Sequence, residues 1–138
     1  MNSDRTGARQ ADRQAWTAED LDVFRLAYDV SLAVHRASLE FPKIEQYSGL
    51  ADQLRRASKS VCSLIVEGVG RQTASSSEFA RYLTMAIGSA EEARLWCRYA
   101  SDLGYIDERT ARDWRERYGQ ILRMLMKLRA SVQQRSDH

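Results

Sequence analysis

The first residues that suggest chemistry are two glycines ahead of a serine-rich segment, in the stretch VEGVGRQTASSSEFAR over residues 66–81. A glycine-rich loop at the start of a helix can bind an anion, because free backbone N–H groups and the helix dipole point towards it. Phosphate loops of this kind follow a β-strand and have the spacing G-x-G-x-x-G or G-x-x-x-x-G-K-[ST]. Only Gly68 and Gly70 are present here, and the pattern before them is helical. The stretch is therefore predicted to be an elbow between two helices rather than a nucleotide site.

The two glycines are expected to end one helix, and a serine to begin the next. Gly68 is predicted to adopt left-handed dihedral angles, with Gly70 as a second permissive position in the turn. Ser75 is expected to cap the following helix, because it precedes a glutamate at capping-box spacing. Turn chemistry leaves Glu67 and Arg71 unexplained. Each is either solvated or paired with the other across the elbow, within the subunit or between subunits.

No other group of residues has the spacing of a catalytic or metal site. His35 lies within an apolar stripe and His138 is the last residue, and neither has a partner at metal-ligand spacing. Glu91 and Glu92 are adjacent, hence about 100° apart around a helix, and do not form a carboxylate pair. We therefore expect no catalytic residue, no metal and no cofactor, and a protein that is not an enzyme.

The cysteines and the hydropathy pattern indicate the compartment. Cys62 and Cys97 lie in apolar helical patterns without Cys-x-x-Cys spacing, which predicts free thiols in a reducing environment. The sequence has no stretch of about 18 apolar residues and no apolar segment after its start. These patterns predict a cytoplasmic protein without a membrane partner.

The elements that position these residues are predicted to be helices. The only proline, Pro42, and several glycines separate segments with helical apolar periodicity. The expected helices cover residues 17–40, 50–67, 75–103 and 107–133. Gly104 is expected to follow the third helix as its C′ glycine, and Asp107 to cap the fourth.

Short connections between four helices predict one all-α domain, an antiparallel up-down-up-down four-helix bundle over residues 17–134. A chain of 138 residues is long enough to bury a core without disulfides or metals. Residues 1–16 are expected to form a flexible polar tail, and residues 135–138 a second, short tail.

The first and third helices each have two apolar stripes, whereas a helix of a four-helix monomer needs only one. One stripe of the first helix is formed by Leu21, Phe24, Tyr28, Leu32, His35 and Leu39. Because monomers rarely expose large apolar patches, the second stripes predict a subunit interface. The candidate interface residues are Val23, Val30, Val34, Phe41, Met85, Trp96, Tyr99 and Leu103. The alternative is that these residues cover the N-terminal segment or lie at the flank of a wide core.

The fourth helix is basic, with eight Lys or Arg and two acidic residues between Arg109 and Arg135, although the whole chain has a net charge of only +2. A basic stripe repeated around an oligomer would bind phosphates in a salt-dependent way. The candidate nucleic-acid-binding residues are Arg55, Arg56, Lys59, Arg109, Arg112, Arg123 and Lys127. No interleaving of aromatic and basic residues suggests base stacking. The alternative is a solvated helix face that binds nothing.

Two long motifs, QLRRASKSVCSLIVEGVGR and SEFARYLTMAIGSAEEA, are followed by LGYI and preceded by a Phe-Pro segment at residues 41–42. Together they resemble the four-helix-bundle proteins encoded within intervening sequences of bacterial 23S rRNA genes, sometimes labelled ribosomal-protein-like. The family signature comprises Glu67, Gly68, Gly70 and Arg71. The chain departs from the family at Cys62 and Leu64, where a proline and an asparagine are common, so no role of that asparagine is transferred here.

The resemblance implies a short bundle that assembles into a ring, typically a homopentamer, without an established enzymatic activity. A related branch, the accessory variability proteins of diversity-generating retroelements, binds nucleic acid and a reverse transcriptase. We therefore expect a non-enzymatic, ring-forming bundle that binds RNA or DNA through its fourth helix. The alternative is a structural or protein-adapter oligomer, for example a reverse-transcriptase accessory protein, with no direct nucleic-acid role.

Overall fold

The computed structural model describes residues 17–136, and within them all regular structure is helical. The long helices are α2 (Asp22–Ser38), α3 (Leu50–Gly70), α4 (Ser76–Asp102) and α5 (Glu108–Ser136), and the 3₁₀ turns are η1 (Ala18–Asp20) and η2 (Lys43–Glu45). The predicted all-α four-helix bundle is confirmed. The expected tail over residues 1–16 and the last two residues lie outside the described part. None of the described helices is long and apolar enough to cross a bilayer.

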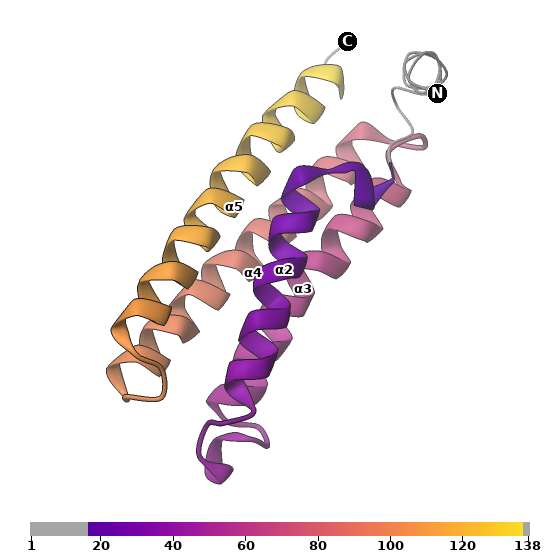
Figure 1. Cartoon of the computed structure of the whole chain (residues 1–138). Coiled ribbons are helices and arrows are strands. Elements are labelled where there is room, and N and C mark those ends of the chain that lie inside the picture. Colours follow the sequence, from indigo (N-terminus) through magenta and orange to yellow (C-terminus); the bar gives the residue numbers. More distant parts are fainter. Residues whose placement is uncertain (1–16, 137–138) are drawn as a thin grey trace, which may run out of the picture.

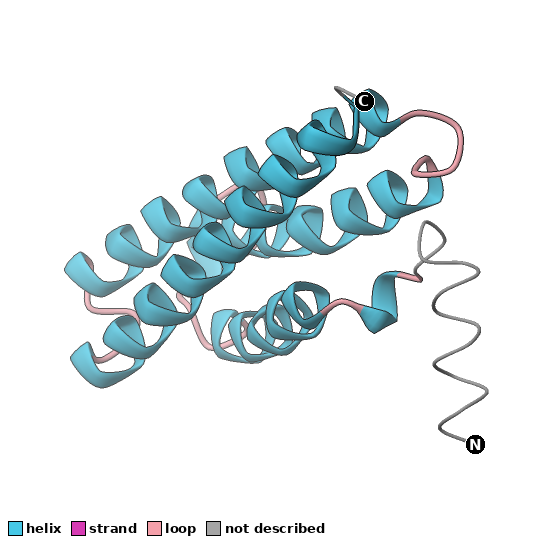
Figure 2. Ribbon diagram, turned by 90° about the horizontal axis from the view of Figure 1, so that it is seen from above, coloured by secondary structure: helices cyan, strands magenta, loops and turns pink. Residues whose placement is uncertain are grey.

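Consecutive helices run antiparallel, and each packs mainly on its neighbours in sequence (Figures 1 and 2). The most extensive contacts are those of α4 with α3 on one side and α5 on the other. Helix α2 closes the bundle by packing on α3 and, less extensively, on α5. Within the described residues no Cα atom of α2 lies within 8 Å of one in α4, and none of α3 lies within 8 Å of one in α5. These two pairs are therefore the diagonals of the bundle.

The apolar stripes of α3, α4 and α5 form the core, as their periodicity predicts. Their fully buried side chains include Leu54, Val61, Ile65, Phe79, Leu83, Tyr118, Ile121 and Leu125. Full burial of one such aliphatic or aromatic side chain stabilises the fold by about 1.5–3 kcal/mol.

Helix α2 faces the core with the stripe that was expected at the subunit interface. Val23, Val30, Val34 and Phe41 are at most 4% exposed in the single chain, so their assignment to an interface is wrong. The other stripe points outward instead, with Tyr28 48% and Leu39 56% exposed. On this buried face small residues alternate with the valines, whereas the outward stripe carries bulkier side chains such as Tyr28 and Leu39. Apolar periodicity alone does not say which of two stripes has the shape that fits.

Three of the predicted helix ends are confirmed. The Ser75 hydroxyl accepts a hydrogen bond from the Glu78 N–H at 3.1 Å. Asp107 Oδ1 accepts one from the Thr110 N–H at 2.8 Å. Gly104 follows α4 with a φ of 79°, the left-handed conformation that glycine adopts without strain. The first helix begins differently from its prediction, because η1 forms a separate turn and Leu21 in extended conformation precedes α2.

Gly68 does not end a helix, which corrects the prediction for this turn. Helix α3 continues through it to Gly70, and among the described residues only Ser48 and Gly104 have a positive φ. A Cβ at residue 68 would lie 3.0 Å from Tyr82 Cβ and 3.1 Å from Phe79 Cδ1. Gly68 is therefore a contact glycine, which lets α3 and α4 approach closely just before the elbow.

Candidate functional site

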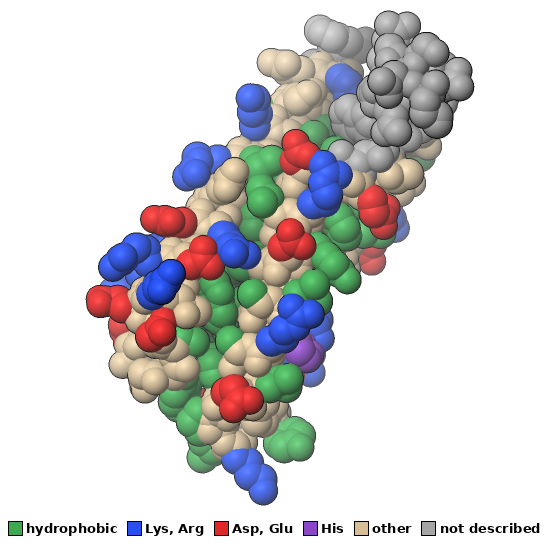
Figure 3. All heavy atoms as spheres, viewed as in Figure 1, with side chains coloured by type: hydrophobic (Ala, Val, Ile, Leu, Met, Phe, Trp, Pro, Cys, Tyr) green, Lys and Arg blue, Asp and Glu red, His purple; other side chains and the backbone are tan. Residues whose placement is uncertain are grey.

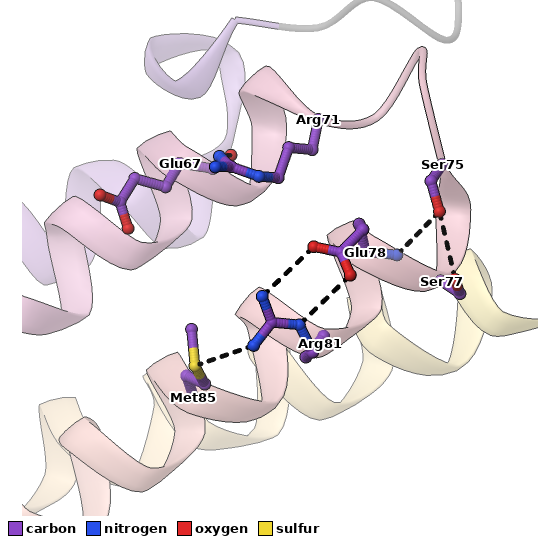
Figure 4. A network of polar contacts seen from close by, with 7 residues as sticks. All are labelled: Glu67, Arg71, Ser75, Ser77, Glu78, Arg81 and Met85. Atoms are coloured by element: carbon purple, nitrogen blue, oxygen red, sulfur yellow. Dashed lines mark hydrogen bonds and ion pairs between the residues drawn. The ribbon is translucent and has the colours of Figure 1, made fainter.

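Two signature residues of the α3–α4 elbow, Glu67 and Arg71, contact one another. Arg71 Nη1 donates a hydrogen bond to the backbone carbonyl of Glu67 at 3.2 Å, and its guanidinium carbon lies 4.5 Å from the centre of the Tyr82 ring. Figure 4 shows the Glu67 carboxylate pointing away from this guanidinium. Within the subunit, Arg71 therefore interacts with the backbone of Glu67 and with an aromatic ring, and not with the Glu67 carboxylate.

A second arginine reaches the same ring from the first turns of α4. The guanidinium carbon of Arg81 lies 5.0 Å from the Tyr82 ring centre, and its nitrogens donate to both carboxylate oxygens of Glu78 at 3.3 Å (Figure 4). Arg81 Nη1 also lies 3.8 Å from the sulfur of Met85. Glu78 neutralises Arg81, so these contacts brace the elbow and do not concentrate positive charge. Tyr82 and Arg81 were not among the residues predicted from the sequence, although both follow the signature within EFARY.

At the opposite end of the bundle, a carboxylate joins two connections. Glu45 Oε1 accepts a hydrogen bond from the Leu50 N–H at 2.8 Å, and its Oε2 accepts one from the Tyr105 hydroxyl at 2.9 Å. These two bonds, the first above all, lower the pKa of Glu45. The rings of Phe41 and Tyr105 lie 5.3 Å apart between centroids. The family-like residues at this end thus position the α2–α3 and α4–α5 connections.

The basic residues predicted on the fourth helix lie exposed along α5. Arg109, Arg112, Arg123 and Lys127 form no ion pair with any residue of the described segment. Arg117, by contrast, pairs with Asp113 at 3.2 Å. The α5 stripe, as we call these four residues, is therefore available to an anionic ligand.

A shallow hollow between α4 and α5 adds arginines that were not predicted from the sequence. Its two adjoining parts, of about 400 and 580 Å³, share Glu91, Arg94 and Arg115. The remaining charged residues that line it are Arg98, Asp102, Glu116 and Arg123. Charges of both signs line this hollow, which shares Arg123 with the α5 stripe. The i, i+4 spacing of Arg94 and Arg98 was the only signal in the sequence.

The basic residues predicted on the second helix lie on another side of the molecule, because α3 and α5 are diagonal. Arg55 is used within the subunit, where Nη1 donates to the Ser38 hydroxyl at 2.6 Å and Nη2 to Gln46 Oε1 at 3.2 Å. Arg56 pairs with Asp52 at 3.0 Å, whereas Lys59 has no ion pair in the described structure. The seven candidates therefore do not form a single surface.

His35 lies half-buried where α2 packs on α3. Burial lowers the pKa of its imidazole, and the positive charges of Lys59, Arg55 and Arg36 lower it further. The seam between α2 and α3 is thus a second region of concentrated positive charge.

Exposed apolar residues line the outer face of α4. Tyr99 is 50% and Leu103 54% exposed, whereas Met85 and Trp96 are half-buried. The indole N–H of Trp96 donates to Glu92 Oε2 at 3.2 Å, and its ring lies 5.6 Å from that of Tyr99. The four α4 candidates for a subunit interface therefore reach the surface, unlike those of α2.

The groups with nucleophilic chemistry lie in the core. Burial raises the pKa of Cys97 to about 12 and also raises that of Cys62, so both thiols are protonated at neutral pH. No group of three or more His, Cys, Asp or Glu within residues 17–136 has the arrangement of a metal site.

The sequence matches the model of one protein family, described as 23S rRNA-intervening sequence protein, over residues 19–127. The fold is similar to the crystal structure, at 1.70 Å resolution, of a protein with unknown function from the S23 ribosomal protein family of Bacteroides thetaiotaomicron VPI-5482. The TM-score is 0.69, and the similarity covers 77% of this chain and 96% of that chain at 17% sequence identity. No curated protein has a significantly similar sequence.

Proposed function

The chain belongs to the 23S rRNA-intervening sequence protein family, and from that premise we propose that it is a non-enzymatic, ring-forming bundle that binds RNA or DNA through α5. The observation that carries the ring is the presence of two apolar surfaces on helices that lie diagonally across the bundle. The nucleic-acid role rests on the α5 stripe.

A ring requires a heterologous contact, in which two different surfaces of each subunit meet. The outward stripe of α2, with Tyr28 and Leu39 about half exposed, supplies one surface. The outer face of α4, with Tyr99 and Leu103 similarly exposed, supplies the other. Because α2 and α4 lie diagonally across the bundle, each can pack on a neighbouring subunit at the same time. Five copies form the proposed ring, as the family resemblance implies.

The α5 stripe then repeats once in every subunit. Its four cations have no ion pairs within residues 17–136, so a phosphate backbone need not displace internal partners. Affinity for a polyanion increases with the number of phosphates contacted and falls with salt. Recognition through backbone phosphates makes this binding independent of base sequence.

Size-exclusion chromatography with light scattering tests the ring. The wild-type chain is expected at the mass of five subunits, and Tyr99→Glu or Leu39→Glu at the mass of one, because each places a carboxylate in a buried interface. Gln120→Glu adds the same charge on exposed α5 and is expected to remain pentameric. A monomeric wild-type chain would contradict the proposed ring.

Electrophoretic mobility shift with structured RNA and duplex DNA across a salt series tests the nucleic-acid role. The double variant Arg123→Ala, Lys127→Ala is expected to bind more weakly. The slope of log affinity against log salt concentration should become shallower by about 0.7–0.9 for each phosphate that is no longer neutralised. The matched control removes two arginines that are already ion-paired, Arg25→Ala with Arg117→Ala. Equal effects of the two double variants would refute a specific role of the α5 stripe.

The alternative function, a protein adapter, is favoured by the hollow between α4 and α5. Charges of both signs, such as those of Glu91, Arg94 and Arg115, complement a protein surface of mixed charge better than a polyanion. A reverse transcriptase is one such partner. A ring that binds neither RNA nor DNA at the lowest salt would support this alternative over the nucleic-acid role.

A further inference from the structure

The seam between α2 and α3 has a concentration of positive charge that the α5 stripe does not account for. His35 and Arg36 come from α2, and Arg55 and Lys59 from α3. Figure 3 shows a histidine flanked by Lys and Arg side chains on this face. Because α3 and α5 lie diagonally across the bundle, the seam and the α5 stripe are separate surfaces.

Hydrogen bonds within the seam hold Arg55 near His35. The Ser38 hydroxyl donates to the His35 carbonyl at 2.8 Å and accepts from Arg55 Nη1 at 2.6 Å. Arg55 is held on its other side by Gln46, so its charge is fixed one helical turn from His35. Lys59 and Arg36 have no ion pair among the described residues, and their charged ends can turn towards a ligand.

No acidic group compensates this charge within the described residues. All of the charged side chains that act on His35 through space are cations, two from α3 and one from α2, and no carboxylate of α5 offsets them. Asp29 and Glu40, the acidic groups nearest His35 along the chain, form no ion pair with Arg36, Arg55 or Lys59 within residues 17–136, and Asp52 is engaged by Arg56. His35 Nδ1 is in addition buried without a hydrogen-bond partner. The surrounding cations therefore disfavour protonation of His35, and no described group accepts a hydrogen bond from its Nδ1.

A bound anion would supply the negative charge and the hydrogen-bond acceptors that the seam lacks. Charge-assisted hydrogen bonds from an ammonium or imidazolium to a phosphate are about twice as strong as those between neutral groups. We propose that the α2–α3 seam is a phosphate-binding site, in which His35 and Lys59 contact the anion and Arg36 and Arg55 supply flanking positive charge. The phosphate belongs to a nucleic-acid backbone or to a free phosphorylated ligand. The site is separate from the α5 stripe, but His35 lies on the same outward stripe of α2 as Tyr28 and Leu39, so anion binding at His35 competes with ring packing through that stripe.

Binding at this site is linked to the protonation of His35. A phosphate raises the pKa of the imidazole, and by reciprocity the protonated imidazole raises the affinity for phosphate. Affinity is therefore expected to increase as the pH falls through the pKa of His35 in the bound state and towards its lowered value in the free chain. Backbone phosphodiesters do not titrate in this range, so the imidazole alone sets the pH dependence of oligonucleotide binding.

The test follows the His35 imidazole by NMR in the full chain, with His138→Ala to remove the other histidine signal. Two probes are titrated in a phosphate-free buffer, inorganic tripolyphosphate and a single-stranded oligouridylate. The His35 pKa is expected to rise with at least one probe. A response to the oligouridylate alone assigns the site to nucleic-acid backbone, and a response to tripolyphosphate alone assigns it to free phosphorylated ligands. No rise with either probe overturns the proposal.

Matched variants separate this site from the α5 stripe. Lys59→Gln is expected to weaken the binding that His35 reports by about fivefold, the effect of losing one charged hydrogen bond. Lys127→Gln removes the same charge from α5 and should leave the His35 response unchanged. His35→Gln should retain weaker binding, measured by calorimetry, and lose its increase between pH 7.5 and 5.5. Equal effects of Lys59→Gln and Lys127→Gln would refute the site, even if the α5 stripe binds RNA as proposed.

Discussion

The Tyr105 hydroxyl donates a hydrogen bond to Glu45 Oε2 at 2.9 Å across 60 positions of sequence. This contact joins the α4–α5 turn to the α2–α3 connection, because the same carboxylate also accepts the Leu50 N–H at the start of α3. Gly49 is required beside it, since a Cβ there would lie 2.6 Å from Glu45 Cα. One end of the bundle is thus closed by a polar contact rather than by apolar burial alone.

Removal of a tyrosine hydroxyl is expected to have opposite effects at two positions. Tyr105→Phe loses the bond to Glu45 and should lower the free energy of unfolding. The Tyr118 hydroxyl is buried in the core beside Ser58, Cys97 and Cys62 without a well-formed hydrogen bond, so Tyr118→Phe should raise the free energy of unfolding by up to about 1 kcal/mol. Urea unfolding of both variants measures the difference. Destabilisation by Tyr118→Phe would mean that this hydroxyl has a partner in solution.

The contribution of Glu45 to stability should depend on pH. The folded state lowers the pKa of this carboxyl through the Leu50 N–H and the Tyr105 hydroxyl. The direction of the pH dependence follows from linkage. The stabilisation is fully present above the pKa of Glu45 in the unfolded state, near 4.5, and is lost as the pH falls through its lower pKa in the folded state. Wild type should thus exceed Glu45→Gln in stability at pH 6, and the difference should shrink as the pH falls towards 3. Chemical denaturation at several pH values measures it, and a constant difference would contradict the assigned contacts.

Two glycine-to-alanine substitutions within helices are expected to have opposite effects on the stability of the fold. Gly68→Ala places a Cβ against Tyr82 and Phe79 and should destabilise the fold by about 1–3 kcal/mol, as overpacking does. Gly88→Ala meets open space in the middle of α4 and should stabilise it by about 0.5–1 kcal/mol. Thermal and urea unfolding compare the pair. Stabilisation by Gly68→Ala would show that the close contact of α3 with α4 is absent.

The helix cap at Ser75 should contribute measurably to stability. Ser75→Ala leaves the Glu78 N–H without its side-chain acceptor, at an expected cost of about 1 kcal/mol. Thr73→Ala, in the exposed turn just before, serves as the control and should change little. Equal unfolding midpoints for the two variants would contradict the cap.

The fold was largely predictable, because periodicity and capping chemistry are local properties. Ser75, Asp107 and Gly104 carry their roles in their own side chains and immediate neighbours, so spacing alone identified them. Gly68 was misassigned because a glycine that ends a helix and one that allows close packing look the same in sequence. The difference lies in Phe79 and Tyr82, which approach it from the next helix.

The candidate surfaces were less predictable, since they depend on what neighbouring helices present. The basic stripe of α5 could be read from one helix, whereas the arginines of the α4–α5 hollow meet only when two helices pack. From its position on the helix alone, Arg55 is predicted to be free to bind a ligand. In the folded chain it instead donates hydrogen bonds to Ser38 and Gln46. The role of Arg71 likewise required Tyr82 beside it.

The sequence by itself determined that this chain is a helical bundle, where its helices begin and end to within a few residues, and to which family it is similar. These properties follow from apolar periodicity and from hydrogen bonds between residues three or four apart. Only the tertiary structure decided that the valine stripe of α2 faces the core and that the outward stripes of α2 and α4 lie on opposite sides. It also decided that Lys59 of α3 lies near enough to His35 of α2 to lower the pKa of the imidazole. Packing selects these relationships through shape and distance between helices, and neither quantity is encoded in the spacing along any single helix.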